Sequence, residues 1–352
     1  MKHILLQEET DIIHHYRANL HCHSINSDGN KSPKQIKKDY LAHGYSIVAF
    51  TDHDVFVSHN DLTDDNFLAL NGYEVEINKE AETYEVTKCC HLCFVALEKD
   101  NDTAVCLHRS KYTWGNATEL AKGMHYDINT LDYERSYTEE CINDMIDKAR
   151  RSGFFVTYNH PAWSLEYYPD YSKYKGMNAM EISNGGCAIC CGRDVDDGII
   201  YDEMLSCGNR IYCIATDDNH NGKPDDSPDC DSYCGCVYII ADKLEYRTIT
   251  KALEDGHFYS STGNYKNVGP RILSITYDDV TKNVEVKTTS ARSILFLTDT
   301  RSFYRWNSEN GKTINYASFK LKDAVSYFRI EVIDDKGYKA FSNAYFADSL
   351  TK

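Results

Sequence analysis

The chain has 352 residues, 42% of them hydrophobic, and its 38 basic and 54 acidic side chains give a formal net charge of −16 at pH 7. A chain of this length can bury a large core, and two domains are the natural expectation. The acidic balance argues against a dedicated nucleic-acid binder, because an acidic surface repels phosphate backbones, although bound metal ions could still attract a small anionic substrate into a cleft.

Residues 1–10 contain only a short apolar run, and no apolar run in the sequence is long enough to span a bilayer. We therefore expect a cytoplasmic protein with no membrane association. In a reducing cytosol most of the fourteen cysteines should be buried thiols rather than members of a disulfide framework. Six of them leave a structural zinc site as an alternative, although their spacing matches no familiar zinc-knuckle pair: Cys187, Cys190, Cys191, Cys230, Cys234 and Cys236.

Seven short apolar runs recur along the chain, and each ends at, or contains, a polar residue of a metal-binding type. One leads into Leu20, and the others cover residues 45–50, 67–70, 89–97, 153–158, 179–182 and 210–215. Between them, helices are predicted over residues 33–42, from the cap residue Ser32, and from Thr138 to Ser152, with a third over 244–254. Alternating strands and helices predict parallel βα units and a βα barrel, in which functional groups gather at the carboxyl ends of the strands.

The sequence pattern changes after Gly263. Short alternating runs there predict strands, and the turn signals between them favour a small all-β sandwich: residues 272–277, 284–288, 294–297, 317–321 and 327–333. We therefore assign residues 1–265 to an α/β barrel and residues 266–352 to a β-sandwich-like module. The second part contains no cluster of metal-ligand residues, so we expect it to pack against the barrel or cap it.

His21 and His23 form the most prominent local motif. Side chains two residues apart on an extended segment point the same way, so the two imidazoles can bind one cation. Together with carboxylates further along the chain, they favour a first-row divalent metal over calcium.

These residues belong to an ordered series of motifs at strand ends. The series resembles the polymerase and histidinol phosphatase (PHP) family of metal-dependent phosphoesterases over residues 14 to about 265: His21-x-His23, Asp28-Gly29, Asp52-His53, Gly72-x-Glu74, His91, His160-Pro161 and Asp218-x-His220. The resemblance implies a distorted seven-stranded βα barrel that holds two or three divalent ions, manganese, zinc or iron.

The resemblance also implies a set of ligands and catalytic residues. The ligands fall into three sets, with Glu74 as a bridge: His21, His23, Glu74 and Asp218; Asp28, His53 and His220; and Glu74, His91 and His160. The expected catalytic residues are Asp52, Glu74 and His220, and Asp52 is expected to orient the histidine that follows it.

Two assignments have close rivals. Glu76 lies on the same strand face as Glu74 and could take the bridging role, although the glycine-x-glutamate pattern of the family favours Glu74. Asp217 is the rival of Asp218, which fits the Asp-x-His spacing better.

Three further residues have more than one interpretation. His91 lies within an apolar run, so it could be a hydrogen-bonded core histidine instead of a ligand. Glu181 could shape the pocket, hold a histidine or touch metal, and Asn184 could contact substrate.

Taken together, these residues predict a hydrolase that cleaves a small phosphate ester by attack of metal-bound hydroxide. The sequence contains no Gly-x-Ser-x-Gly motif and no P-loop, which argues against a serine hydrolase and a nucleoside-triphosphatase. Candidate partners for phosphate are Arg193, Lys223 and the pair Arg109 and Lys111.

Two alternatives accompany this prediction. The segments 216–221 and 256–263 are similar to a PHP branch of carbamate or aryl-ester hydrolases, so a non-phosphate ester is the second substrate class. A catalytically silent metal-binding or ligand-binding protein is the other alternative, and the complete ligand set argues against it. The polar and aromatic segment 101–129 is expected to form a lid or to cover the barrel rim.

Overall fold

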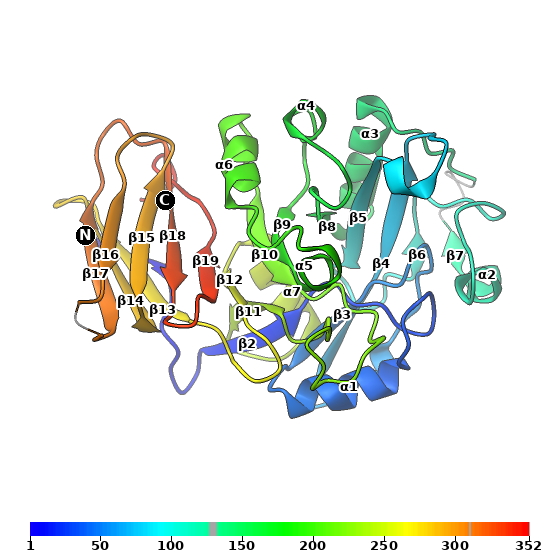
Figure 1. Ribbon diagram of the computed structural model, residues 1–352, viewed down its shortest axis with the longest axis horizontal. Helices are drawn as coiled ribbons and strands as arrows, with labels where there is room; N and C mark the ends of the chain where they lie inside the picture. The colour runs from blue at the N-terminus through cyan, green and yellow to red at the C-terminus, as the bar shows by residue number, and fades with distance from the viewer. Residues whose placement is uncertain (127–131, 310, 352) are drawn as a thin grey trace.

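The computed structural model describes residues 1–126, 132–309 and 311–351. Its mixed α/β class agrees with the prediction. Seven strands of the described chain lie side by side in one large sheet, in the order β10-β9-β8-β5-β4-β3-β2 (Figure 1). Each corresponds to one predicted run: β2 (His14–Asn19), β3 (Ile47–Phe50), β4 (Leu68–Asn78), β5 (Cys89–Ala96), β8 (Phe154–Asn159), β9 (Ala179–Asn184) and β10 (Tyr212–Thr216).

Strand β5 departs from the predicted parallel arrangement, because it runs antiparallel to both of its neighbours, β4 and β8. A parallel pair needs a crossover of a dozen or more residues, whereas residues 79–88 between β4 and β5 contain only the short 3-10 turn η2 (Tyr84–Val86). The amino end of β5 therefore lies beside the carboxyl end of β8, where His91 is paired with Asn159. This reversal explains why His91 lies inside an apolar run and still reaches the same edge of the sheet.

The two ends of this seven-strand stretch meet beyond the strands themselves. The backbone N–H of Asp218 donates to the His21 carbonyl oxygen at 3.0 Å, and the N–H of His23 donates to the Asn219 carbonyl oxygen at 3.1 Å. Next to β2, the sheet continues into β11 (Gly235–Ala241) and β12 (Phe258–Thr262). An added Cβ at Gly235 would lie 2.3 Å from the Thr216 carbonyl oxygen, so only glycine lets β11 begin this close to β10.

The three predicted helices are α1 (Pro33–Ala42), α3 (Glu139–Arg151) and α7 (Tyr246–Glu254). The side chain of Ser32 caps α1 by accepting from the Gln35 N–H, and Thr138 caps α3 in the same way. Further helical segments occupy the connections: α2 (Ala117–Leu120), α4 (Tyr168–Tyr171), α5 (Gly185–Cys191), α6 (Gly198–Ser206), η1 (Asn60–Leu62) and η3 (Ala121–Gly123). No helix in the described part of the chain is long and apolar enough to cross a membrane.

The C-terminal strands lie at one end of the molecule (Figure 1). One four-stranded sheet has the order β1-β13-β14-β17, and the others continue the large sheet beyond β12 in the order β19-β18-β15-β16, with β20 beside β18. Their bounds are β1 (Lys2–Leu6), β13 (Ile272–Asp278), β14 (Asn283–Ala291), β15 (Ser293–Thr298), β16 (Tyr304–Asn307), β17 (Ile314–Lys320), β18 (Tyr327–Ile333), β19 (Lys339–Ser342) and β20 (Tyr345–Phe346); β6 (Thr103–Ala104) and β7 (His125–Tyr126) pair separately.

Alternating buried residues join the two C-terminal sheets. The ring of Phe296 on β15 stacks on Phe319 of β17, with ring centroids 4.6 Å apart, and on Phe328 of β18 at 5.0 Å. Five of these strands were predicted from this alternation. The pattern did not indicate β16, whose four residues are all exposed.

The cysteines follow the expectation of free thiols. Nine of the fourteen are buried, and none forms a disulfide. Among the described residues, no group of side chains close enough to share an ion contains a cysteine. The alternative of a cysteine zinc site is therefore not supported by the geometry.

Candidate metal centre

All nine predicted ligands converge at one edge of the large sheet. Within the described chain, they fall into four overlapping groups in which the ligand atoms lie within 4.8 Å of one another. The groups are His21, His23, Glu74 and Asp218; His23, Asp28, His53 and His220; His53, Glu74 and His91; and His21, His160 and Glu181.

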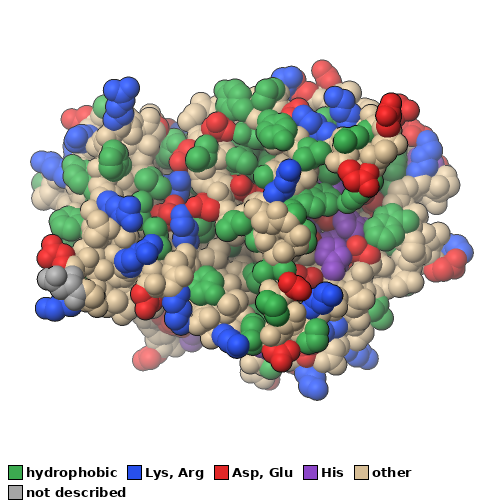
Figure 2. Space-filling view, in the orientation of Figure 1, with side chains coloured by type: hydrophobic (Ala, Val, Ile, Leu, Met, Phe, Trp, Pro, Cys, Tyr) green, Lys and Arg blue, Asp and Glu red, His purple; other side chains and the backbone are tan. Residues whose placement is uncertain are grey.

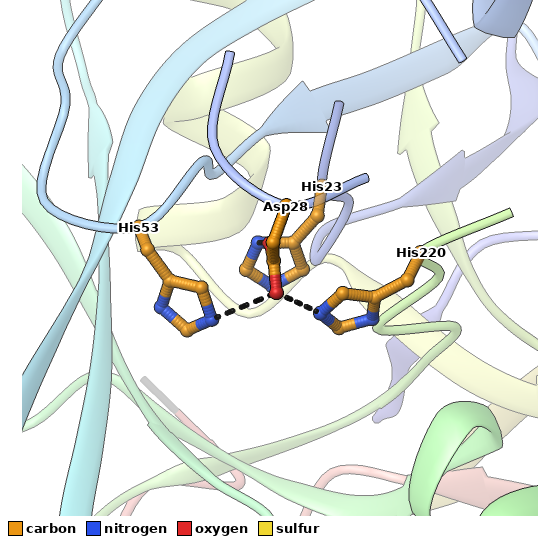
Figure 3. Close-up of side chains that lie close together, drawn as sticks. All are labelled: His23, Asp28, His53 and His220. Atoms are coloured by element: carbon orange, nitrogen blue, oxygen red, sulfur yellow. Dashed lines mark ion pairs between the residues drawn. The ribbon is translucent and has the colours of Figure 1, made fainter. Parts of the chain in front are cut away.

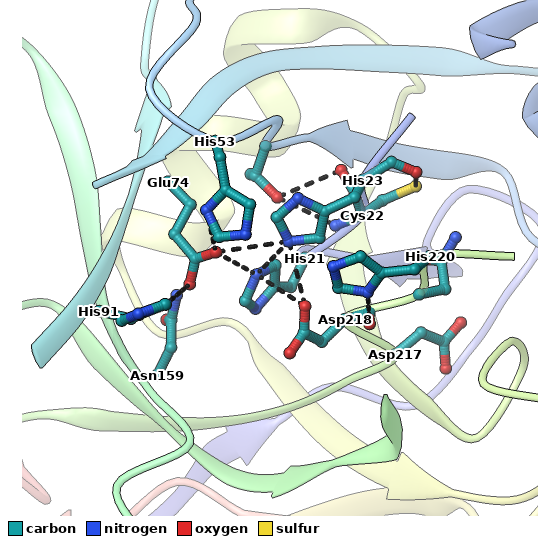
Figure 4. Close-up of polar contacts among 12 residues, drawn as sticks. His21, Cys22, His23, His53, Glu74, His91, Asn159, Asp217, Asp218 and His220 are labelled. Atoms are coloured by element: carbon teal, nitrogen blue, oxygen red, sulfur yellow. Dashed lines mark hydrogen bonds and ion pairs between the residues drawn. The ribbon is translucent and has the colours of Figure 1, made fainter. Parts of the chain in front are cut away.

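The first group is built around the two histidines of the opening motif (Figure 4). The Nε2 atoms of His21 and His23 lie 3.1 Å apart, and Oδ1 of Asp218 lies 3.2 Å and 3.1 Å from them. Two ligands that each sit about 2.1 Å from one ion are about 3 Å apart, so these separations suit a shared cation. Backbone hydrogen bonds between the segments after β2 and β10 hold the three side chains together.

The second group surrounds Asp28 at the mouth of the site (Figure 3). Its Oδ2 atom lies 3.1 Å from Nε2 of His220 and 4.0 Å from Nε2 of His53, and its Oδ1 atom lies 3.6 Å from Nδ1 of His23. His23 thus presents Nε2 to the first group and Nδ1 to the second. The His220 side chain is 36% exposed, so this group faces the solvent.

Glu74 lies between the groups (Figure 4). Its Oε2 atom lies 3.3 to 3.4 Å from ring nitrogens of His21, His23 and His53. Its Oε1 atom lies 3.2 Å from His91 and 3.4 Å from His160. This central position is the one expected of a bridging carboxylate.

The rival residue, Glu76, lies at the edge of the cluster. Its carboxylate is 3.7 Å from Nε2 of His91 and accepts a hydrogen bond from the side chain of Asn78. Of the two glutamates, the geometry favours Glu74 for the bridging position.

Buried atoms without partners show that these residues fit a cation. Four buried side-chain atoms of the cluster have no hydrogen-bond partner in the described structure: His23 Nδ1, His53 Nδ1, Glu74 Oε2 and His91 Nε2. A buried polar atom without a partner costs free energy, and coordination to an ion removes that cost. The mixture of imidazole nitrogen and carboxylate oxygen suits manganese, zinc or iron.

In the metal-free cluster, the acidic side chains and the histidines shift one another's pKa values. Burial opposes ionisation of Glu74, yet the neighbouring histidines outweigh it and hold the pKa of Glu74 well below its ordinary value. Burial also opposes protonation of His21, but Asp218 and Glu74 hold the pKa of His21 well above its ordinary value. Burial and the charge of His23 lower the pKa of His53 to about 3. The raised pKa values of His21 and His23 favour their protonated forms when no metal is bound.

Metal affinity should consequently fall as the pH is lowered. Protons on His21 and His23, whose pKa values are raised, must leave before a cation can bind, so each displaced proton should weaken binding about tenfold per pH unit. Calorimetric metal titrations between about pH 8 and pH 6, in buffers of different ionisation enthalpy, would count the released protons. An affinity that does not change over this range would contradict the expectation.

Glu181 holds a histidine, which is one of the three roles that the sequence left open. Its Oε1 atom lies 2.7 Å from Nδ1 of His21 and accepts from the Thr216 hydroxyl at 2.6 Å. Its Oε2 atom accepts from the His160 backbone N–H and from the Asn184 amide, both at 2.8 Å. Asn184 is completely buried, and its side-chain amide also donates to the Asp218 carboxylate at 3.1 Å.

Replacing Glu181 by glutamine should weaken metal binding without destroying the site. The change keeps the size of the side chain but removes the negative charge next to His21, and losses of this kind typically cost about 10- to 100-fold in metal affinity. Metal content after dialysis at a fixed free-metal concentration would measure the effect. The matched control is Glu80→Gln, a change at an exposed residue outside the cluster, which should leave metal affinity unchanged.

Asp52 takes a different position from the predicted one. Its carboxylate accepts hydrogen bonds from the backbone N–H of Ser24 at 2.7 Å and from the hydroxyls of Ser24 and Ser27. It therefore fixes the turn between His23 and Asp28 and does not orient His53. The carboxylate is buried and directed at this turn, so the geometry gives no support for a catalytic role of Asp52.

Asp217 is also directed away from the cluster. Its carboxylate accepts from the Tyr40 hydroxyl and from the backbone N–H groups of Tyr233, Cys234 and Gly235. Asp218 is thus the member of this pair that joins the cluster, as the spacing predicted.

The cluster forms the floor of a pocket of about 920 Å³. Its walls include apolar side chains that the sequence did not single out, Tyr84, Trp163 and Ile189, together with Cys190. Trp114, from the predicted lid or rim segment, also lines the pocket; residues 127–129 of that segment lie outside the described residues. Figure 2 shows histidines in a hollow with hydrophobic side chains on either side.

The proposed phosphate partners are mostly engaged elsewhere. Arg109 pairs with Asp132, and Lys111 pairs with Glu134. Arg193 donates to the Ala162 carbonyl oxygen at 2.6 Å. Lys223 is the one lysine or arginine among the described residues that line the pocket.

No protein-family model and no curated protein matches the chain. Among solved structures, it is similar to PHP-like metal-dependent phosphoesterases. A two-domain protein from Bacteroides vulgatus that contains a predicted PHP-like metal-dependent phosphoesterase aligns over 97% of this chain and 98% of its own, at 14% identity and a TM-score of 0.42.

Two further structures cover less of this chain. A protein from Bifidobacterium adolescentis described as a metal-dependent phosphoesterase aligns over 59% of this chain and 89% of its own, with 13% identity and a TM-score of 0.37. An amidohydrolase from Chromobacterium violaceum with bound sulfate and no metal aligns over 68% and 96%, with 14% identity and a TM-score of 0.37.

Proposed function

We propose that this protein is a metal-dependent hydrolase that cleaves a small phosphate ester. The observation that carries the proposal is the buried Glu74 carboxylate, whose Oε2 atom has no hydrogen-bond partner among the described residues and lies 3.3 to 3.4 Å from three imidazoles. Such a carboxylate is stable in the interior when cations lie between it and the rings. Two or three ions of manganese, zinc or iron would suit the ligand groups.

Divalent ions in such a site lower the pKa of a bound water and stabilise negative charge on the ester oxygens. The chain's own residues position the substrate. Asp28 and His220 face the mouth, so the ester enters on their side of the cluster. Lys223 lines the same pocket and can donate to a phosphate oxygen. In this proposal Glu74 and His220 are catalytic residues, as the family resemblance implies.

The proposal includes an architecture. The strands from β2 to β10 would form a distorted seven-stranded barrel, closed by the hydrogen bonds between the segments that follow β2 and β10. Residues 1–265 would form this unit and residues 266–352 a β-sandwich-like module, with β1 added to the module because it pairs with β13.

A non-phosphate ester, such as an aryl ester or a carbamate, is the second candidate substrate. The observation that favours it is the sparse positive charge of the pocket, where Lys223 accompanies apolar walls and the additional acids Asp229 and Asp231. A phosphate group usually has more cationic partners than this, although the metal ions would supply positive charge.

The test is a substrate panel assayed with purified protein loaded with manganese, zinc or iron. Phosphomonoesters, phosphodiesters, aryl carboxylic esters and carbamates would be compared by release of phosphate or alcohol. We expect the unmodified protein to release phosphate, and we expect this activity to be lost in His53→Ala and Asp218→Ala. Turnover of aryl esters alone would replace the phosphatase proposal by the second candidate, and metal binding without any turnover would favour a silent binding protein.

A further inference from the structure

Two of the three tryptophans in the chain line the metal pocket. Trp114 lies beside His53, with ring centroids 5.8 Å apart, and its side chain is strongly exposed. The loop that carries Trp114 is attached to the turn between His23 and Asp28, because the Asn116 side chain donates to the Ile25 carbonyl oxygen at 2.9 Å. A large apolar ring is thus held in solvent next to a predicted ligand.

Trp163 lies on another side of the cluster. Its ring packs edge-on against His91 and His160, with centroids 5.5 and 5.1 Å away. The Asp194 carboxylate accepts from the backbone N–H groups of Ala162 and Trp163 at 2.9 and 2.7 Å, which fixes this segment. Trp163 is therefore positioned before any substrate binds, and such preorganisation lowers the entropic cost of binding.

We propose that the substrate carries a flat aromatic group beside its scissile ester and that this group packs against Trp114 and Trp163. The inference rests on the proposed function, because it describes the leaving group of the same hydrolysis. Aromatic rings gain free energy from packing against one another beyond the area they bury, and ligand pockets are typically lined by apolar and aromatic side chains around a few polar groups.

The charges of the pocket restrict the rest of the substrate. Glu76, Asp229 and Asp231 line the pocket in addition to the predicted ligands, and Lys223 is the one lysine or arginine among the described lining residues. A second anionic group, carried by the leaving group, would be repelled by these acids. The substrate is therefore a single phosphate ester of an uncharged aromatic alcohol. A pocket of about 920 Å³ has room for a leaving group much larger than the phosphate itself.

The reaction is a simple hydrolysis. The oxygen of water bonds to phosphorus, the bond between phosphorus and the oxygen of the aromatic alcohol breaks, and that oxygen takes up a proton. The products are inorganic phosphate and the free alcohol, and no oxidant or further reactant is required.

Benzyl phosphate and cyclohexylmethyl phosphate form a matched pair of test substrates. Both have an alkyl leaving oxygen of similar reactivity and similar bulk, so they differ chiefly in aromaticity. We expect kcat/KM to be about three- to tenfold higher for benzyl phosphate, mostly through a lower KM. In Trp114→Ala and Trp163→Ala the ratio of the two kcat/KM values should fall towards one. Trp306→Ala is the control, because Trp306 is similarly exposed but lies on β16, outside the pocket, and should keep the preference.

A second measurement needs neither metal nor turnover. The three indole N–H signals of the metal-free protein can be assigned in nuclear magnetic resonance spectra from the three Trp→Ala variants. Benzyl alcohol should shift the signals of Trp114 and Trp163 more than cyclohexylmethanol does, and leave that of Trp306 unchanged. These shifts without any phosphate release would support the aromatic site while overturning the phosphatase proposal. Equal turnover of both phosphates with no selective shift would overturn the aromatic site and leave the phosphatase intact.

Discussion

Replacing Glu74 by glutamine is expected to remove nearly all hydrolytic activity and at least one bound metal ion. The amide keeps the size of the side chain but carries no charge, and both oxygens of Glu74 face histidines in the cluster. A bound ion typically contributes several kcal/mol to stabilisation of the transition state, and about 1.4 kcal/mol corresponds to a factor of ten in rate. We therefore expect kcat/KM to fall by about a thousandfold.

The control for this variant is Glu76→Gln. Glu76 lies two residues further along the same face of β4 and lines the same pocket, but its carboxylate lies 3.7 Å from the nearest predicted ligand, His91. Metal content measured by elemental analysis should be nearly normal in this variant. If Glu76→Gln lost the metal and Glu74→Gln kept it, the bridging role would have to move to Glu76.

Replacing Arg135 by methionine is expected to destabilise the protein by about 3–5 kcal/mol, because it leaves a buried carboxylate without its partner. The side chains of Arg135 and Asp54 form an ion pair in which each is only 2% exposed. Arg135 also donates to the carbonyl oxygens of Glu76 and Cys106 at 2.9 and 3.1 Å. Asp54 directly follows His53, so this pair also supports the metal cluster. Denaturant unfolding would measure the loss.

The pH dependence of this loss provides an internal check. Burial raises the pKa of Asp54 to about 6 even with Arg135 present. Without the arginine, the carboxyl should protonate on folding, so the destabilisation should be larger at about pH 8 than at about pH 5. Adding Asp54→Asn should recover part of the stability. By contrast, Arg151→Met, which removes the exposed pair between Arg151 and Asp147, should change little.

The sequence could indicate the candidate ligands that the fold brings together, because their signals are local. A histidine two residues from another on an extended segment must share its direction, and a polar residue at the end of an apolar run must lie at an edge of the sheet. His21, His23 and Asp218 follow these rules. The caps of α1 and α3 are also local signals, so Ser32 and Thr138 marked both helix starts correctly.

The residues that support the ligands could not be found in the same way. Arg135, which pairs with Asp54, and Trp163, which packs on His91, reach the cluster only through long-range contacts, and their neighbours in the sequence carry no pattern that indicates it. Glu181 was noticed at a strand end, but the sequence left its role open among three possibilities. Asp52 was misplaced because its position before His53 suggested a contact with that ring, whereas the chain turns its carboxylate towards Ser24. The reversal of β5 was hidden for a similar reason, since an apolar run does not reveal its direction.

Strand β1 imposes an order on the assembly of this protein. It is the first strand along the chain, yet its hydrogen-bonded partner is β13, with Lys2 opposite Asp278. During synthesis this strand must wait for its partner until residue 278 has left the ribosome. Contacts so distant in sequence form slowly, because the chain loses the entropy of closing a long loop before it gains the contact. The completion of this sheet is therefore expected to be a late event in folding.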